Sequence, residues 1–334
     1  MYIVDSYGLA VVFCIITMIG WGSWANTLKM SSKLWEFPLY YWDYSIGIVL
    51  TTLLFGFTFG STGDEGRGFI DDLLQADGSA ITSAFVGGVI FNISNLLIVA
   101  ATAIAGMAVA FPIAVGLALV IGVVVNYIAT PLGNPYLLFI GLFLVVAAIL
   151  FDAAAYRKLP QDKKGAQKKG IIISVLSGIL MGFFYRFVAA SMTTNFTTPD
   201  AGLLTPYSAI FIFALGIFIS NFVFNTWFMY KPIAGKPVNY ADYFKLGTPK
   251  LHMIGILGGI IWAAAMEFNL IASEQAGFAI SYGLGQGATM ISAAWGVFVW
   301  KEFAAAPKST NKLLAAMFSL FIIGLSLIVI ARLN

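Results

Sequence analysis

Three ionisable side chains stand inside long apolar stretches of the chain: Asp43, Arg186 and Glu267. A charge at the centre of a membrane helix costs about 2.5 to 3.5 kcal/mol, so a retained charge usually faces a partner or a water-filled cavity. Arg186 lies 16 residues after Gly170, and Glu267 lies 16 residues after Leu251. Because an α-helix rises about 1.5 Å per residue, two helices that begin at one membrane face bring both side chains to a similar depth. The sequence therefore predicts an ion pair between Arg186 and Glu267.

Two interpretations of this pair stay open. As a functional site, the Glu267 carboxylate accepts and releases a proton, and Arg186 is its counter-ion or donates hydrogen bonds to a bound solute. As a structural pair, the two charges hold two helices together. We favour the functional interpretation, since carriers that alternate their access bind ions and solutes near the bilayer midplane.

Asp43 is the ionisable residue of "YYWDYSIGIVL", which runs from Tyr40 to Leu50. If its helix begins at residue 38, the carboxylate lies only about 8 Å inside the membrane edge. At this depth the side chain suits a gate, or an acceptor for the free backbone amides at the start of a helix. A direct contact to the solute is the alternative. The aromatic residues next to Asp43 are also typical of a membrane interface.

Neutral polar and aromatic side chains at mid-helix positions complete a candidate solute site. The amides of Asn92, Asn95 and Gln286 offer hydrogen-bond donors and acceptors, which suits an uncharged ligand with carbonyl and N–H or O–H groups. Five aromatic side chains could line or stack on such a ligand: Trp21, Trp24, Trp262, Tyr282 and Trp295. The alternatives are hydrogen bonding between helices for the amides and ordinary packing for the rings.

Composition decides which class of protein these residues belong to. Of the 334 residues, 60% are hydrophobic and 10% charged, whereas soluble domains are roughly 45 to 50% apolar and about 25% charged. Such a chain is a membrane protein. Its single cysteine and single histidine, Cys14 and His252, leave no disulfide framework, no cysteine metal cluster and no pair of nucleophile and base. "GAQKKG" lacks the form of a phosphate-binding loop, so we expect neither an enzyme nor a cofactor or metal.

Polar and glycine- or proline-rich breaks divide the chain into ten membrane spans. The predicted spans are 7–28, 38–60, 80–104, 107–128, 136–155, 170–194, 206–229, 252–275, 278–300 and 312–331. Nearly all Lys and Arg residues follow odd-numbered spans, and the other loops and the two ends hold only Arg67 and Arg332. The positive-inside rule therefore predicts cytoplasmic odd loops and two external termini in the cell membrane. The lysines lie in loops rather than on one basic face, which argues against nucleic-acid binding.

An internal repeat links the two halves of the chain. "GGVIFNISNLLIVAATAIAGMAVAF" begins at Gly87, and "GGIIWAAAMEFNLIASEQAGFAISY" begins at Gly258 and aligns with it without a gap. Chance similarity between glycine- and alanine-rich helices is the alternative. The copies lie five spans apart, and an odd offset inverts one half relative to the other, as in secondary transporters. We therefore expect an all-α fold of two inverted five-helix repeats, residues 1–156 and 170–334, joined by a basic cytoplasmic linker at 157–169.

Several of these stretches resemble a known family. "YWDYSIGIVLTTLLFGFTFGSTG", the first repeat copy and "QAGFAISYGLGQGATMISAAWGVFVWKEF" are similar to the ureide permease family of the drug/metabolite transporter (DMT) superfamily. The resemblance implies a ten-helix carrier that imports small uncharged polar solutes, such as ureides and nucleobases, with protons. A neighbouring branch of the superfamily carries sugars such as glucose, ribose and rhamnose. Plant members are described with a long central loop that bears a nucleotide-binding-like motif, whereas the corresponding loop here is short and basic.

The working hypothesis is therefore a secondary active transporter that imports a small neutral solute by alternating access. Glu267 and Arg186 couple transport to protons, with sodium as the alternative ion, and Asp43 forms a gate. The rival hypotheses are a sugar or nucleoside importer of the same fold, and efflux of drugs or metabolites.

Overall fold

The computed structural model describes residues 1–31, 35–159 and 168–333, and within them the fold is all-α. Its elements are α1 (Tyr7–Ser23), α2 (Ala25–Ser31), α3 (Phe37–Phe57), α4 (Phe69–Gln75), α5 (Gly78–Ala105), α6 (Met107–Ala129), α7 (Pro135–Tyr156), α8 (Lys168–Ser191), α9 (Pro206–Asn221), α10 (Phe224–Tyr230), α11 (Tyr240–Leu246), α12 (Pro249–Ala276), α13 (Phe278–Gly285), α14 (Ala288–Ala294), the π-helical segment η1 (Trp295–Val299) and α15 (Thr310–Ala331). The linker predicted at 157–169 lies for the most part outside the described residues.

Eight stretches of the described chain are long and apolar enough to cross a membrane: α1 with α2, α5, α6, α7, α8, α9 with α10, α12 and α15. The prediction of a polytopic helical membrane protein is therefore confirmed. Two predicted spans do not meet this measure. In α3, Asp43 and its aromatic neighbours lower the mean hydropathy. The predicted span at 278–300 divides into α13, α14 and η1, because the chain leaves the helix after Gly285.

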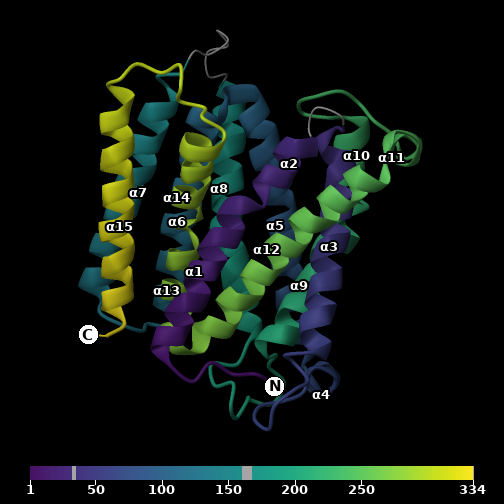
Figure 1. Ribbon diagram of the computed structural model, residues 1–334. Coiled ribbons are helices and arrows are strands. Elements are labelled where there is room, and N and C mark those ends of the chain that lie inside the picture. The colour runs from purple at the N-terminus through teal and green to yellow at the C-terminus, as the bar shows by residue number, and fades with distance from the viewer. Residues whose placement is uncertain (32–34, 160–167, 334) are drawn as a thin grey trace.

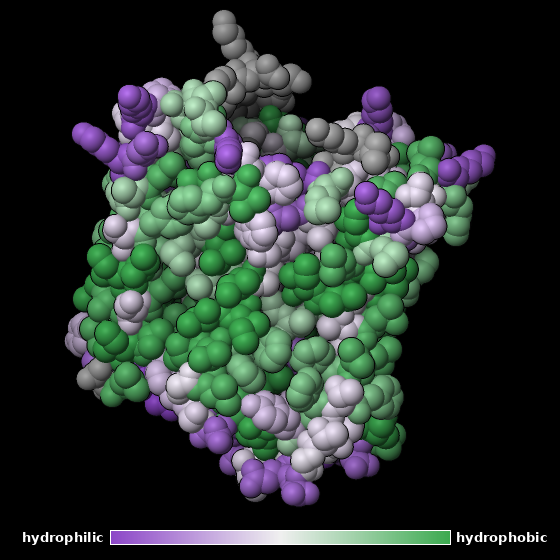
Figure 2. Space-filling view, in the orientation of Figure 1, coloured by the Kyte–Doolittle hydropathy of each residue, from purple (hydrophilic) through white to green (hydrophobic). Residues whose placement is uncertain are grey.

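The surface agrees with a membrane setting. Figure 2 shows a broad hydrophobic band across the middle of the face in view, with hydrophilic residues gathered at its two ends. Both termini lie at one end, and the last residues of α2 and α7 and the loop that follows α10 lie at the other (Figure 1). That other end is the one predicted to be cytoplasmic, and we refer to it as the basic end.

The two longest helices end in the same way. Both α5 and α12 have 28 residues, and each is followed by a glycine with positive φ, +80° at Gly106 and +82° at Gly277. A residue with a side chain rarely adopts this conformation, which lets the chain reverse directly into the next helix. These two glycines occupy matching positions in the predicted repeat, 171 residues apart (277 − 106).

Helix packing follows a similar pattern in the two halves. Helix α5 packs against α8 and α9, whereas α12 packs against α1 and α3, and α12 crosses the bundle diagonally (Figure 1). Gly88 of α5 lies so close to α9 that a Cβ atom would collide with the carbonyl of Phe213. Gly259 of α12 approaches α3 equally closely, at the carbonyl of Tyr44. Small residues at these crossings allow the backbones to approach, as is usual between membrane helices.

Candidate functional site

Glu267 lies inside the bundle on α12 and is 1% exposed. Neither oxygen of its carboxylate has a hydrogen-bond partner among the described residues. Tyr207, at the start of α9, is close enough to interact electrostatically with Glu267, and its hydroxyl donates to the carbonyl of Tyr2 at 2.9 Å. The carboxylate is therefore a buried acid that forms no salt bridge with a cation of the described residues.

The predicted ion pair between Arg186 and Glu267 does not form in this structure. Tyr185, one residue before Arg186, is the side chain of α8 that reaches α12, and its hydroxyl donates to Oδ1 of Asn269 at 2.7 Å. Asn269 follows Glu267 by two residues, so the two side chains point about 200° apart around the helix. Glu267 therefore faces away from α8, and Arg186 is only partly buried. The equal height of the two residues on their helices does not bring the side chains together.

Asp43 lies near the basic end of α3 and is 1% exposed. Its Oδ2 lies 2.9 Å from Nδ1 of His252 on α12, and its Oδ1 accepts a hydrogen bond from the hydroxyl of Tyr243 on α11. The Trp35 ring stacks on Tyr243 and meets the edge of His252, at centroid distances of 5.6 and 4.9 Å. These four residues, which we call the Asp43 cluster, join three helices. Burial, and then the hydrogen bond to Asp43 and its charge, raise the pKa of Tyr243, so its hydroxyl stays a donor.

An aromatic stack occupies the centre of the bundle. The ring of Trp21 on α1 stacks on Trp262 of α12 with a centroid distance of 6.1 Å and an interplanar angle of 14°. Phe91 of α5 and Phe213 of α9 pack on Trp262 at 4.5 and 6.0 Å. The indole N–H of Trp21 is buried without a hydrogen-bond partner among the described residues. The stack is thus a packed set of aromatic rings from α1, α5, α9 and α12 that holds one donor without a partner among the described residues.

A second chain of contacts links two further predicted residues. Trp24 packs on Tyr44 at 5.0 Å, and Tyr44 stacks on Tyr41 at 5.3 Å. Asn95 donates to the Tyr41 hydroxyl at 3.2 Å, whereas the Tyr44 hydroxyl has no partner within the described chain. Asn92, one turn from Asn95, donates to α9 instead.

Gln286 lies at the break between α13 and α14. Gly285 before it packs against the Trp21 ring and Gly287 after it against the sulfur of Met18, where a Cβ atom would be too close. The glycines of "GLGQG" therefore allow both a close approach to α1 and an interrupted helix. The side chain of Gln286 is half-buried beside the aromatic stack.

Tyr282 and Trp295 make polar contacts with the protein itself. The Tyr282 hydroxyl lies within hydrogen-bond distance of the carbonyls of Ala118 and Met181, at 3.2 and 3.3 Å. The indole N–H of Trp295 donates to Oγ of Ser23 at 2.9 Å. In this conformation both side chains join helices rather than present free polar groups. Of the predicted solute residues, Trp21 keeps a donor without a partner among the described residues, and Tyr44, which packs on Trp24, keeps an unpartnered hydroxyl.

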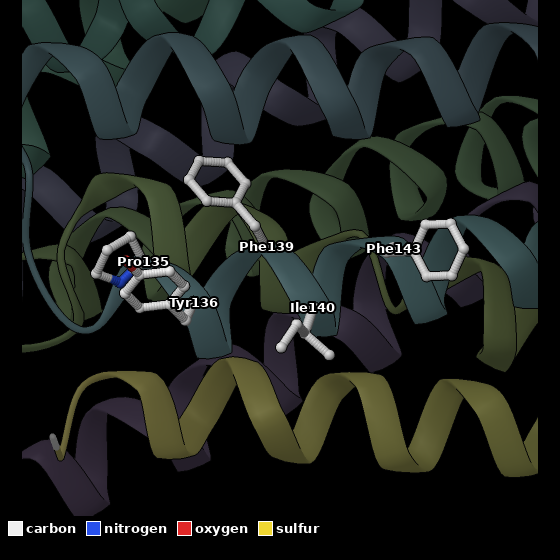
Figure 3. A pocket seen from close by; sticks show the side chains of 5 residues that line it. All are labelled: Pro135, Tyr136, Phe139, Ile140 and Phe143. Atoms are coloured by element: carbon white, nitrogen blue, oxygen red, sulfur yellow. The ribbon is translucent and has the colours of Figure 1, made fainter.

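One hollow on the surface has a different chemistry from these buried groups. Figure 3 shows a shallow hollow along α7, lined by Pro135, Tyr136, Phe139, Ile140 and Phe143. Its lining is almost wholly apolar, and Tyr136 and Phe143 are 79% and 69% exposed, as expected for a face that meets lipid. Within the described residues no group of three or more His, Cys, Asp or Glu side chains could hold a metal ion.

Comparison with known proteins adds an independent finding. The sequence model of the ureide permease family matches residues 40–170 and 164–331. The chain is 21% identical over 386 aligned residues to Ureide permease 1 of Arabidopsis thaliana, covering 98% of both chains. It is 23% identical over 346 residues to Probable ureide permease A3 of Vigna unguiculata, covering 83% of this chain and 91% of the relative.

A shorter similarity connects the chain to a bacterial protein named for sugar uptake. Probable glucose uptake protein GlcU of Priestia megaterium is 27% identical over 191 residues, which cover 57% of this chain and 54% of the relative.

Proposed function

Because the chain belongs to the ureide permease family, we propose that it imports a small uncharged polar solute, a ureide or a nucleobase, by proton-coupled secondary active transport. The names of the plant relatives support this solute class. The observation that carries the coupling is the Glu267 carboxylate, buried without a hydrogen-bond partner among the described residues. The protein works in the cell membrane, with both termini outside and the basic end in the cytoplasm.

Ten spans in two inverted repeats form the carrier. This arrangement is supported by the matching positive-φ glycines at the ends of α5 and α12. It is further supported by helix packing. Helix α5 of the first half contacts α8 and α9 of the second half, and α12 of the second half contacts α1 and α3 of the first. Inverted repeats give such carriers two similar bundles that can rock around one site.

The solute lies between the aromatic stack and the Tyr41–Tyr44 pair, within reach of Gln286. Flat heterocycles and ureides pack on the Trp21 and Trp262 faces, because stacking on aromatic rings needs no specific pattern of atoms. The free indole N–H of Trp21 and hydroxyl of Tyr44 bind carbonyl or N–H groups, with the amide of Asn95 beside them. Burial of an unpaired donor is costly, so a ligand that pairs with these groups gains affinity.

Proton coupling runs through Glu267. A carboxylate ion without a partner in a dry interior costs several kcal/mol, so the protonated side chain fits the packing seen here. A conformation that brings water or a cation to the carboxylate favours release of the proton. Arg186 is the candidate counter-ion in that second conformation, although it is not in contact with Glu267 in this one. Net movement of a proton across the membrane then requires the protein to alternate between the two conformations.

Asp43 forms the inner gate. The Asp43 cluster holds α11 against α3 and α12 at the basic end, so solute release on that side requires the cluster to open. A carboxylate held by a tyrosine and a histidine suits this role better than a direct solute contact, because both oxygens already have partners.

Uptake into proteoliposomes tests the proposal. Purified protein is reconstituted, a pH gradient that is acidic outside is imposed, and uptake of labelled ureides and nucleobases is measured. We expect accumulation that collapses when a protonophore removes the gradient, and Glu267→Gln should still exchange solute but no longer accumulate it. Accumulation by Glu267→Gln that follows the pH gradient as in the wild type would overturn the role of Glu267.

A sugar is the second candidate solute, because the chain is also similar to a probable glucose uptake protein. The same proteoliposomes decide between the two classes. Inhibition of labelled nucleobase uptake by excess glucose or ribose, together with uptake of the labelled sugar itself, would support the sugar.

A further inference from the structure

The membrane segment from Pro206 to Tyr230 is broken before its last seven residues, which form α10. Helix α9 ends at Asn221 and α10 begins at Phe224. None of the hydrogen bonds found for the described residues joins the amide of Asn225 to the carbonyl of Asn221, as an unbroken helix requires. The carbonyl oxygens of Ile219 and Ser220 accept instead from the amides of Phe222 and Val223, so the regular helix ends at membrane depth, where irregular backbone is tolerated only against protein or a cavity.

Two asparagines on the inner side of the bundle flank this break, one at the end of α9 and one in α10. Asn221 and Asn225 are fully buried, whereas the side chains of Phe222 and Val223 between them are 57% and 64% exposed. The amide of Asn225 donates to the carbonyl of Pro38 at 2.9 Å, which leaves its Oδ1 without a partner. Neither Oδ1 nor Nδ2 of Asn221 has a hydrogen-bond partner in the described chain.

Asn92 of α5 brings a third amide to the same place. It is fully buried, and its Nδ2 donates to Oγ of Ser220 at 2.7 Å and to the carbonyl of Ile217, both on the last turns of α9. Its Oδ1 has no hydrogen-bond partner among the described residues. Asn92 therefore abuts the end of α9 directly before Asn221.

Contacts through α3 connect Asn225 of α10 to α5. The carbonyl of Pro38, which holds Asn225, is one turn before Tyr41, whose hydroxyl accepts the hydrogen bond from Asn95. Asn95 follows Asn92 by one turn on α5. Helices α3, α5, α9 and α10 thus surround one polar region in an apolar setting.

The free atoms of this region are mainly acceptors. The amide nitrogens of Asn92 and Asn225 donate to carbonyl oxygens, which fixes the orientation of both amides and leaves oxygen as the free atom. Asn221 adds a third amide oxygen. These three oxygen atoms are shielded from solvent, so a cation that binds them must shed its water shell and take protein oxygens instead.

We propose that Asn92, Asn221 and Asn225 supply amide oxygens to a sodium ion at the end of α9. Small hard cations take oxygen ligands, and the C-terminal end of a helix carries partial negative charge. Carriers with discontinuous helices use the ends of half-helices for this purpose. The proposal goes beyond the proposed function, since it depends neither on the identity of the solute nor on proton transfer at Glu267.

Thermal stability of the purified full-length protein tests the site. Unfolding is followed in detergent while NaCl replaces choline chloride at constant ionic strength, with KCl as a parallel series. A cation that binds only the folded protein raises its unfolding temperature in a saturable way. We expect this rise with Na⁺ and not with K⁺, and we expect Asn221→Ala and Asn225→Leu to abolish it.

A matched control and a second variant make the result decisive. Asn126 of α6 is equally buried, donates to the carbonyl of Gly122 at 2.8 Å and also has an unpartnered Oδ1, so Asn126→Leu should keep the Na⁺ response. Asn221→Asp keeps the side-chain size, adds a charge and should raise the apparent Na⁺ affinity by about tenfold or more.

Two results would overturn the sodium site. The first is equal stability of the wild type in Na⁺, K⁺ and choline. The second is a wild-type Na⁺ response in both Asn221→Ala and Asn221→Asp. Exchange of labelled solute in sodium-free buffer without ion gradients tests the transport proposal separately.

Discussion

Nδ1 of His252 lies 2.9 Å from Oδ2 of Asp43, although 209 residues separate the two in the chain. The contact joins α12 to α3 near the basic end of the bundle, and the hydroxyl of Tyr243 brings α11 to the same carboxylate. Gly255 stands one turn after His252, and a Cβ atom there would collide with the side chain of Asp43. The small residue thus allows the carboxylate to enter between the helices, and the histidine and tyrosine satisfy it.

Tyr243→Phe removes one of the two hydrogen bonds to Asp43 and leaves the ring contact with Trp35. A hydrogen bond to a charged group contributes about 1.5 to 3 kcal/mol. We therefore expect α11 to detach more often and its amide hydrogens to exchange at least about tenfold faster, as measured by mass spectrometry. Tyr240→Phe is the control, because it lies on the same helix and its hydroxyl pairs with the half-buried Thr226 rather than with Asp43. Equal exchange in the two variants would contradict a latch at Asp43.

Sequence could predict eight of the ten proposed spans because membrane helices are long and apolar, and the ureide permease family is also confirmed. It could not predict the break after Asn221. The break lies in "ISNFVFNTWF", which holds no glycine or proline, so local propensity gives no signal there. "YGLGQG" differs, since its glycines permit close packing or a locally opened helix.

The candidate site was predicted less completely for a geometric reason. Counting residues from a helix end gives the height of a side chain, which is how Arg186 and Glu267 were matched. The direction around the helix depends on which neighbours each helix packs against, and this is a long-range property. The partners of Asp43 were missed for the same reason, because His252 and Tyr243 meet it only through the packing of α11 and α12.

Arg186→Gln tests whether the arginine takes part in coupling. If Arg186 pairs with Glu267 in a second conformation, its loss should shift the pH dependence of uptake and slow proton-driven accumulation by about tenfold, since a lost charge pair costs 1 kcal/mol or more. Lys169→Gln, at the opposite end of α8, is the control. If Arg186→Gln takes up solute with an unchanged rate and pH profile, Arg186 takes no part in coupling and Glu267 is the sole candidate of the pair.

The aromatic stack should decide affinity for planar solutes. Trp21→Leu removes the flat face opposite Trp262 and the free indole N–H, so the solute loses stacking and one hydrogen bond. We expect the apparent affinity, measured from the ligand-induced rise in unfolding temperature, to fall by about tenfold or more. Trp227, which is 50% exposed on α10, provides the control variant Trp227→Leu. An equal ligand response in Trp21→Leu and the wild type would exclude the stack as the solute site.

Tyr282→Phe separates a packing role from a solute contact. The hydroxyl of Tyr282 is fully buried and lies within hydrogen-bond distance of two backbone carbonyls, on α6 and on α8. Its removal leaves acceptors that have other helical partners, so we expect a loss of about 0.5 to 1.5 kcal/mol in stability and no change in solute affinity. Thermal unfolding with and without solute measures both quantities on one sample. A fall in solute affinity larger than that of Trp21→Leu would instead place Tyr282 in the solute site, because a hydroxyl that only joins helices makes no contact with the solute.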